Sequence, residues 1–303
     1  MWTFTAMNTE VAVAAPGLAE TAAHALAGEV GDLFAAAEAR FSRFRPDSEL
    51  ARLNRAGGPT VVSPALFDAL VDARAHVAAT GGLFDPTIGA ALCAAGYDRS
   101  RVAGPLDRPD APGPPPPVSF GAVTLDPATR SVARPPGVVL DLGGMIKGRT
   151  VDAAVRLLAD RGADLALVDA GGDAALVGAG PTGDGWRIDV EDPAQPARTL
   201  LTLIVRDRAV ATSGTNRRRW HVGGVVAHHL IDPRTARPST SALAQVTVLA
   251  PTVEQADVLA KAALLAGADA GARLLGSFPA VAAVLVAHDG ELHRVGALEV
   301  DHG

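Results

Sequence analysis

Hydrophobic residues recur at helical spacing in several segments of the chain. Leu18–Phe41 is rich in alanine, with recurring Leu, Val and Phe, which predicts a long helix. Leu66–Ala79 shows the same pattern and ends at Thr80-Gly81-Gly82, residues that typically stop a helix. Further helices are predicted over about Arg149–Arg161, Val253–Leu265 and Ala270–Leu275.

Short apolar and β-branched runs between turn residues predict strands. Thr3–Ala15 is the first, and Gly137–Leu142 is an apolar strand that ends in a glycine pair. The other predicted strands are Leu165–Asp169, Ala174–Val177, Trp186–Val190, Thr199–Val205, Ala209–Thr212, Trp220–Val222, Ala227–Ile231, Ala244–Leu249 and Val281–Val286. Strands that mostly follow one another, with helices at intervals, predict an α+β fold with a largely antiparallel sheet.

Composition narrows the class of protein. With 303 residues, the chain suffices for one large domain or two interleaved lobes. A net charge of −6 argues against sequence-independent binding of nucleic acid, which needs clustered cations. The single cysteine, Cys93, excludes an internal disulfide and a multi-thiolate metal site. The proline-rich stretch Val102–Val118 predicts a surface loop, because proline removes backbone donors.

The sequence contains no membrane-targeting pattern. No basic segment followed by a long apolar run opens the chain, so no signal peptide is expected. No stretch of about 18 apolar residues could span a membrane. We therefore expect a cytoplasmic protein.

Two predicted strands each end in an acidic residue that precedes a glycine pair. In Asp141–Gly148, the glycines let a ligand approach the backbone, and Lys147 follows near a helix start, where backbone N–H groups also favour anions. Val168–Asp173 repeats the acid and the glycine pair, so the two turns could frame a cleft. Both segments are equally compatible with ordinary turns, and the residues alone leave the choice open.

Thr80–Thr87 has two possible roles. Asp85 and Thr87 could cap a following helix with Pro86 in its first turn. The preceding Gly-Gly-Leu-Phe instead places the ring of Phe84 where a flat ligand could stack.

His229 ends an apolar run and precedes a turn at Asp232-Pro233. An imidazole at a strand end beside a turn can meet a substrate while the strand fixes its backbone. A lone histidine is more often structural, so its weight depends on the other segments.

Asp257 and Lys261 lie one helical turn apart in a strongly apolar predicted helix. They could form an ordinary surface ion pair. The apolar surroundings favour partial burial of Asp257, and a buried carboxylate needs a cation or hydrogen bonds.

In this order, the segments resemble the ApbE-type flavin transferase family, the FAD:protein FMN transferases. The resemblance covers roughly Ala6 to Gly267 and is consistent with a single domain of this type over residues 1–303. Its carriers are Phe41–Leu50 with Leu53-Asn54, Gly82–Thr87, Asp141–Gly148, Ala170–Asp173, Thr212–Gly214, His229–Pro238 and Ala256-Asp257.

The resemblance implies that FAD binds in a cleft between two α+β lobes. It also implies that, with Mg²⁺, FMN is transferred to a Thr or Ser hydroxyl of an acceptor protein while AMP leaves. It makes His229 the general base, and it places the Mg²⁺ on the carboxylate of Asp257 and the main-chain oxygens of Gly144 and Ala260. The implied flavin-nucleotide contacts are Met7, Phe44, Leu83, Phe84, Asp85, Asp141, Lys147, His229 and Ile231.

Three positions depart from the family pattern. Asn8 replaces a glycine after Met7, and Asn tolerates positive φ. Ala236 replaces the glycine of a turn, which we expect to change the turn type. Lys261 stands where a metal-binding threonine is common. Its ammonium could replace part of the metal's charge, or swing away and leave the metal site intact, and we favour the second.

The residues leave two alternative functions open. One is an FAD pyrophosphatase that releases FMN and AMP to water, because it needs the same pocket. The other is a non-catalytic FAD-binding protein, which the lysine at position 261 would favour if it abolishes metal binding.

Overall fold

The computed structural model describes residues 1–98, 107–108, 113–216, 218–222 and 225–301. The chain forms two compact units that interleave along the sequence. The first unit consists of Met1–Ala35, Lys147–Asn216 and Ser241–Gly303, and the second of Ala36–Ile146 and Arg217–Thr240. The mixture of helices with largely antiparallel sheets confirms the predicted α+β class.

The first unit is built on an eight-stranded sheet whose neighbouring strands are all antiparallel. Strand β16 is buried along its whole length, which fits a central strand. In sheet order the strands are β1 (Trp2–Ala6), β2 (Thr9–Ala14), β7 (Ala166–Ala170), β8 (Ala174–Val177), β11 (Arg208–Gly214), β16 (Leu243–Ala250), β17 (Ala282–Ala287) and β18 (Leu292–Val295).

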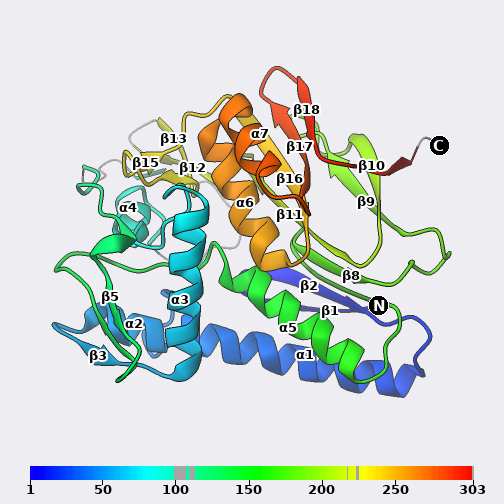
Figure 1. The fold of residues 1–303 in the computed structure, drawn as a ribbon, viewed down its shortest axis with the longest axis horizontal. Helices are drawn as coiled ribbons and strands as arrows, with labels where there is room; N and C mark the ends of the chain where they lie inside the picture. Colours follow the sequence, from blue (N-terminus) through cyan, green and yellow to red (C-terminus); the bar gives the residue numbers. More distant parts are fainter. Residues whose placement is uncertain (99–106, 109–112, 217, 223–224, 302–303) are drawn as a thin grey trace. The chain divides into compact units, whose positions relative to one another are not determined.

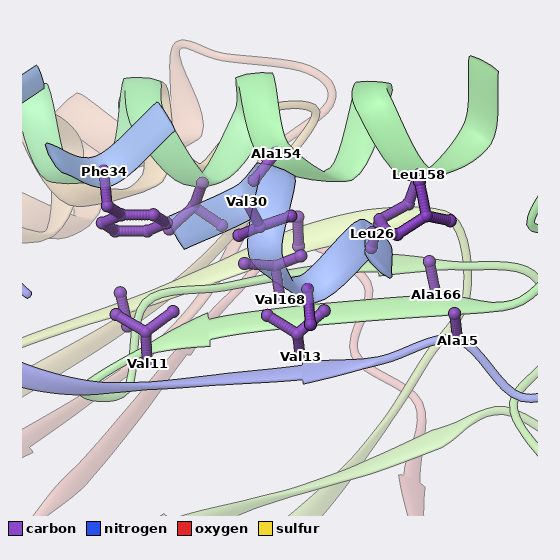
Figure 2. Packing of buried hydrophobic residues seen from close by; sticks show 14 of the residues in the cluster. Val11, Val13, Ala15, Leu26, Val30, Phe34, Ala154, Leu158, Ala166 and Val168 are labelled. Carbon is purple, nitrogen blue, oxygen red and sulfur yellow. The ribbon is translucent and has the colours of Figure 1, made fainter. Parts of the chain in front are cut away.

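Helices α1 (Glu20–Phe41) and α5 (Ile146–Asp160) cover one face of this sheet (Figure 1). Figure 2 shows Leu26, Val30 and Phe34 of α1 and Leu158 of α5 meeting strand residues such as Val168. Strand side chains alternate between the two faces, so the opposite face needs its own cover. Three further strands supply it, β9 (Trp186–Glu191), β10 (Thr199–Val205) and β19 (Val300–Asp301), whose apolar residues join Leu176, Val210 and Val284.

Helix α6 (Val253–Ala266) lies on β11 and β16 and continues into α7 (Ala268–Gly276). Its start touches α5. The carboxylate of Asp152 in α5 accepts the backbone N–H groups of Val253 at 2.8 Å and Glu254 at 3.0 Å. A Cβ at Gly148 of α5 would lie 2.7 Å from the nitrogen of Glu254, so only glycine permits this approach. The two helices are thereby joined at one point.

The second unit combines short helices with small sheets (Figure 1). Its largest helix, α3 (Pro64–Ala79), begins at Ser63, whose side chain accepts the N–H of Leu66. The other elements are α2 (Glu49–Arg55), α4 (Gly89–Ala94), η1 (Phe120–Ala122), the sheet of β3 (Thr60–Val61), β6 (Ser131–Ala133) and β5 (Thr124–Asp126), the sheet of β13 (Val225–His228), β12 (Arg219–Val222) and β4 (Asp107–Arg108), and the pair β14 (Ile231–Asp232) with β15 (Arg237–Pro238).

The predicted helices are confirmed, with ends shifted by at most three residues. Most predicted strands are confirmed too. Three were wrong: Thr3–Ala15 is a hairpin, Ala227–Ile231 is divided between β13 and β14, and Gly137–Leu142 makes only one bridge, between Val139 and Ile88. The predicted loop Val102–Val118 lies largely outside the described residues.

The segment expected as strand 137–142 is irregular because other groups satisfy its backbone. The side-chain amide of Asn54 donates to the carbonyl of Leu140 and accepts its N–H, both at 2.8 Å. The N–H of Asp141 bonds to the carbonyl of Pro86 at 2.8 Å. Side-chain pairing thus replaces a sheet ladder. Among the helices of the described ranges, none has the length and apolar character needed to cross a membrane.

Candidate functional site

In the first unit, Lys147 and Asp173 form a buried ion pair. Lys147 sits in the first turn of α5, and Asp173 follows the glycine pair after β7. Only 16% of the Lys147 side chain and 5% of the Asp173 side chain are exposed. The ammonium also donates to the carbonyl of Ala170 at 2.8 Å, and Asp173 accepts the N–H of Thr212 at 3.3 Å. In the second of the two acid-glycine turns, Lys147 therefore pairs with Asp173, the acid after the glycine pair, and not with Asp169, the acid before it.

A second ion pair lies on α6. Lys261 Nζ donates to Asp257 Oδ1 at 2.8 Å, and the two side chains are 17% and 8% exposed. The predicted burial of Asp257 is therefore confirmed. The ammonium rests on the carboxylate instead of swinging away, which is the less favoured of the two arrangements expected from the sequence.

The two pairs influence each other electrostatically. Burial raises the pKa of Asp173, Lys147 opposes that rise, Asp257 adds to it, and Lys261 lowers it again, with a net increase. We call Lys147, Asp173, Asp257 and Lys261 the lysine cluster. The cluster pairs two ammonium groups with two carboxylates, and Lys147 lies in the first turn of α5, where backbone N–H groups favour anions such as phosphate.

In the second unit, Arg43 organises a group of rings. Its guanidinium bonds to the carboxylate of Asp141 and to the carbonyl of Tyr97. It also lies 4.1 Å from the ring centroid of Phe44 and 5.2 Å from that of Tyr97. Because the side chain of Arg43 is only 5% exposed, these contacts fix the loop after α1.

Tyr97 links this arginine to His229. The ring of Tyr97 stacks on Trp220 at 5.5 Å and 14°, and its centroid is 6.4 Å from that of His229. Ile231, 2% exposed, belongs to the same apolar group as Phe44, Tyr97 and Trp220. We call Arg43, Phe44, Tyr97, Trp220 and His229 the aromatic cluster. It brings the predicted flavin contacts Phe44, His229 and Ile231 together.

The run Leu83–Asp85 has other neighbours. Phe84 is 4% exposed and meets His76 edge-on at 6.0 Å, so its ring faces the interior. Asp85 accepts the N–H and hydroxyl of Thr87 and the N–H of Phe120. The expected helix cap does not form, because α4 begins only at Gly89 and no side chain caps it. Leu83 is half-buried.

Met7 lies in the first unit, in the two-residue turn between β1 and β2. Met7 and Asn8 have φ of 49° and 65°, values that suit the twist of a tight hairpin. Asparagine tolerates positive φ and therefore suits this turn. Ala236 also has a positive φ of 55°, and the expected change of turn type stays a prediction. The side chain of Met7 packs against the helix-covered core.

The residues expected to hold Mg²⁺ do not fit that ion. Lys261 occupies an oxygen of Asp257, and a protonated lysine repels a divalent cation. Ala260 lies inside α6, where helix carbonyls accept N–H groups four residues on. Gly144 lies in the turn before α5. In the described part of the chain, no three His, Cys, Asp or Glu residues gather as metal ligands.

Sequence reasoning missed four members of these clusters, Asp173, Arg43, Tyr97 and Trp220. Asp173 and Arg43 stand inside motifs that the sequence singled out, Val168–Asp173 and Phe41–Leu50, and the polar residue within each motif was the available signal. Tyr97 stands in no motif, and Trp220 was noted only as the first residue of a predicted strand. Their roles depend on tertiary contacts alone.

The chain thus has an antiparallel α+β fold, two buried Lys–Asp pairs in the first unit and a histidine beside aromatic rings in the second. Residues 7–285 match the model of the ApbE family. This chain belongs to the ApbE family.

Individual proteins that are similar to this chain support its membership of the ApbE family. The chain is 35% identical to an FAD:protein FMN transferase of Treponema pallidum, with 88% of this chain and 78% of that protein covered. It is 30% identical to one of Vibrio cholerae, with 84% and 77% covered. Among solved structures, the ApbE protein of Thermotoga maritima is similar with a TM-score of 0.83 and 26% identity over 97% of this chain and 96% of that one. The Vibrio cholerae flavin transferase ApbE has a TM-score of 0.81 at 25% identity, with the same shares covered.

Proposed function

We propose that this protein transfers the FMN part of FAD to a Thr or Ser hydroxyl of an acceptor protein and releases AMP. The observation that carries the proposal is the lysine cluster, which holds Lys147 on a buried carboxylate at the start of a helix. Membership of the ApbE family and relatives named FAD:protein FMN transferase support it.

The proposed chemistry is displacement at phosphorus. The acceptor hydroxyl oxygen attacks the FMN phosphorus, the bond from that phosphorus to the bridging oxygen breaks, and AMP leaves with the bridging oxygen. Such transfer depends on positioning and on neutralising charge on the phosphate oxygens. Lys147 supplies a fixed positive charge for that purpose. Asp173 and Ala170 orient its ammonium, so little reorganisation is needed when the anion binds.

His229 takes the proton of the hydroxyl in this proposal. Imidazole titrates near neutral pH, which suits a general base. The half-buried ring lies beside Tyr97, so its orientation is restricted. Phe44, Tyr97 and Trp220 provide ring surfaces suited to a flat flavin. No step runs through Mg²⁺, because the residues expected to bind it do not fit the ion.

Substituting His229 tests the proposal. Wild-type protein incubated with FAD and a threonine-containing acceptor protein should yield an acceptor with covalent flavin fluorescence on a denaturing gel. His229→Ala should still bind FAD but transfer FMN roughly 10²–10⁴-fold more slowly at saturating FAD, because a general base typically contributes that much. Unchanged transfer by the variant would remove His229 from this role.

His228 provides a matched control. It is buried, its Nε2 lies 3.1 Å from the carbonyl of Ser239, and its Nδ1 accepts the N–H of Leu230 at 3.3 Å. His228→Gln should lower stability but leave the transfer rate of the folded protein within a few-fold. Free FMN and AMP without a flavinylated acceptor would identify a pyrophosphatase, and bound but unreacted FAD would identify a flavin-binding protein.

A further inference from the structure

The chain contains only two lysines, and both belong to the lysine cluster. Of 27 Lys and Arg residues, Lys147 and Lys261 are the lysines, which leaves 25 arginines. Elsewhere the cations are arginines, as in the surface pair of Arg187 with Asp184. An ammonium is a compact charge with three donors, whereas a guanidinium is a planar fork. The two lysines therefore point to a task that needs a small, concentrated charge.

That kind of charge is what a metal ion supplies at a phosphate. Lys261 reaches Asp257 along one turn of α6, with 17% of its side chain exposed. The carboxylate of Asp257 holds the ammonium of Lys261 in place at 2.8 Å. A hydrated Mg²⁺ at Asp257 would have to displace this ammonium or lie beside it, and both cost electrostatic energy.

We propose that the ammonium of Lys261 takes the place of a divalent cation at Asp257, so that FAD binding and FMN transfer by this protein need no Mg²⁺. This inference rests on the proposed function. Lys147 and Lys261 then share the negative charge of the diphosphate.

The reaction balances without a metal. The acceptor oxygen forms one bond to the FMN phosphorus, and the bond to the bridging oxygen breaks with its electron pair on AMP. The hydroxyl proton goes to the imidazole of His229. No electron transfer occurs, and both ammonium groups keep their protons throughout.

The first experiment compares FMN transfer to the acceptor protein in EDTA and in Mg²⁺. We expect the two rates to agree within about twofold. A tenfold or larger loss in EDTA would overturn the inference and leave the proposed function intact. If no transfer occurs in either condition, the proposed function fails. The inference about Lys261 is then tested by the measurement of metal binding described next.

Metal binding is measured with Mn²⁺ by electron paramagnetic resonance, with and without FAD. We expect no protein-bound Mn²⁺ in the wild type without FAD, and with FAD no more than FAD alone binds. Mn²⁺ bound by the wild type and lost in Asp257→Asn would overturn the inference. This titration needs no catalytic turnover.

Lys261→Thr provides the converse test. It removes the ammonium and places a hydroxyl oxygen one turn from Asp257. We expect it to bind Mn²⁺ and to lose roughly tenfold to a hundredfold in transfer rate in EDTA, the range for one charge-assisted contact, with recovery in Mg²⁺. Failure to gain either metal binding or Mg²⁺ stimulation would count against the inference.

Two further variants control for charge and for folding. Arg273→Thr removes an exposed cation of α7 in the same unit and should leave metal-free transfer unchanged. Lys261→Met removes the ammonium without adding a ligand, so it should lose metal-free transfer and not regain it with Mg²⁺. Recovery of Lys261→Met by Mg²⁺ would contradict the proposed role of the ammonium.

Discussion

Arg43 in the second unit and Lys147 in the first each hold an aspartate that lies within a sequence motif, but the surroundings of the two pairs differ. The guanidinium of Arg43 uses its planar fork on Asp141 and Tyr97 and its face on two rings. The ammonium of Lys147 lies on Asp173 and one carbonyl, with a second ammonium nearby on Asp257. A cation spread over many contacts serves the fold, whereas a concentrated one remains suited to bind an anion.

The largest expected effect on stability comes from removing the ion pair between Arg43 and Asp141. Arg43→Met leaves the carboxylate of Asp141, 12% exposed, without its cation. Removing one partner of a buried pair typically costs about 3–5 kcal/mol, so the free energy of unfolding should fall by about that amount. Denaturation in urea measures it.

Arg45→Met is the matched control for that substitution. Arg45 pairs with Asp47 at 3.1 Å, but the side chains are 46% and 68% exposed. An exposed pair contributes at most about 1 kcal/mol. Equal losses in Arg43→Met and Arg45→Met would show that the buried arginine has no special part in the second unit.

A smaller effect, the pH dependence of the free energy of unfolding, tests the ion pair of Lys147 with Asp173. Burial raises the pKa of Asp173 in the folded protein above its unfolded value of 3.8. The stability that this group contributes is therefore fully present below the unfolded pKa and is lost as pH rises through the folded pKa. The amide of the Asp173→Asn variant cannot ionise, so this variant does not lose that stability as the pH rises. The variant should gain stability relative to the wild type as pH increases, by about 1.4 kcal/mol for each unit between the two pKa values.

Unfolding free energies measured in urea at a series of pH values provide the test. The differences between wild type and variant cancel the titration of the other acids. A difference that stays constant with pH, or that changes in the opposite direction, would mean that Lys147 outweighs burial at Asp173.

The smallest expected effect concerns a backbone feature of the second unit. Ala236 is held at φ 55°, a conformation that costs a non-glycine residue about 1 kcal/mol. Ala236→Gly should therefore stabilise the protein slightly, by about 0.5–1 kcal/mol after the added freedom of the unfolded chain is counted. Thermal denaturation measures this change.

Ala75→Gly in α3 is the control with the opposite sign. Ala75 is exposed within a helix, where glycine costs about 0.5–1 kcal/mol. If both substitutions destabilise the protein, the positive φ at Ala236 carries no strain.

Periodicity predicted the helices well because their apolar residues recur over many turns, as in α1 and α6. The residue pattern predicted one strand over residues 3–15, since this segment contains no glycine or proline to mark a turn, and only the resemblance to the family pointed to a turn at Met7-Asn8. Strand 137–142 was wrong because Asn54, remote in sequence, replaces its sheet partner. Local pattern cannot show where a distant side chain satisfies the backbone.

The candidate site could be predicted only in part, because local sequence pattern does not show contacts between residues far apart in the chain. Resemblance to a family pointed to Lys147, Asp257 and His229 as positions in motifs. The partner of Lys147, and the placement of Arg43 against Asp141 across 98 residues, depend on the folded chain. The orientation of Lys261 toward Asp257 was open from the sequence, because both arrangements suit an i,i+4 spacing.

The contact between α5 and α6 has a consequence for ligand choice. Lys147 is the residue before Gly148, which allows the close approach, and Lys261 lies further along the helix that begins there. Because Asp152 fastens the same junction, the two helices that carry the lysines are held at a fixed position relative to each other where α6 begins. A bulkier residue at position 148 would push α5 and α6 apart. The separation of the two ammonium groups would then increase, and the length of an anion that both could contact at once would change with it.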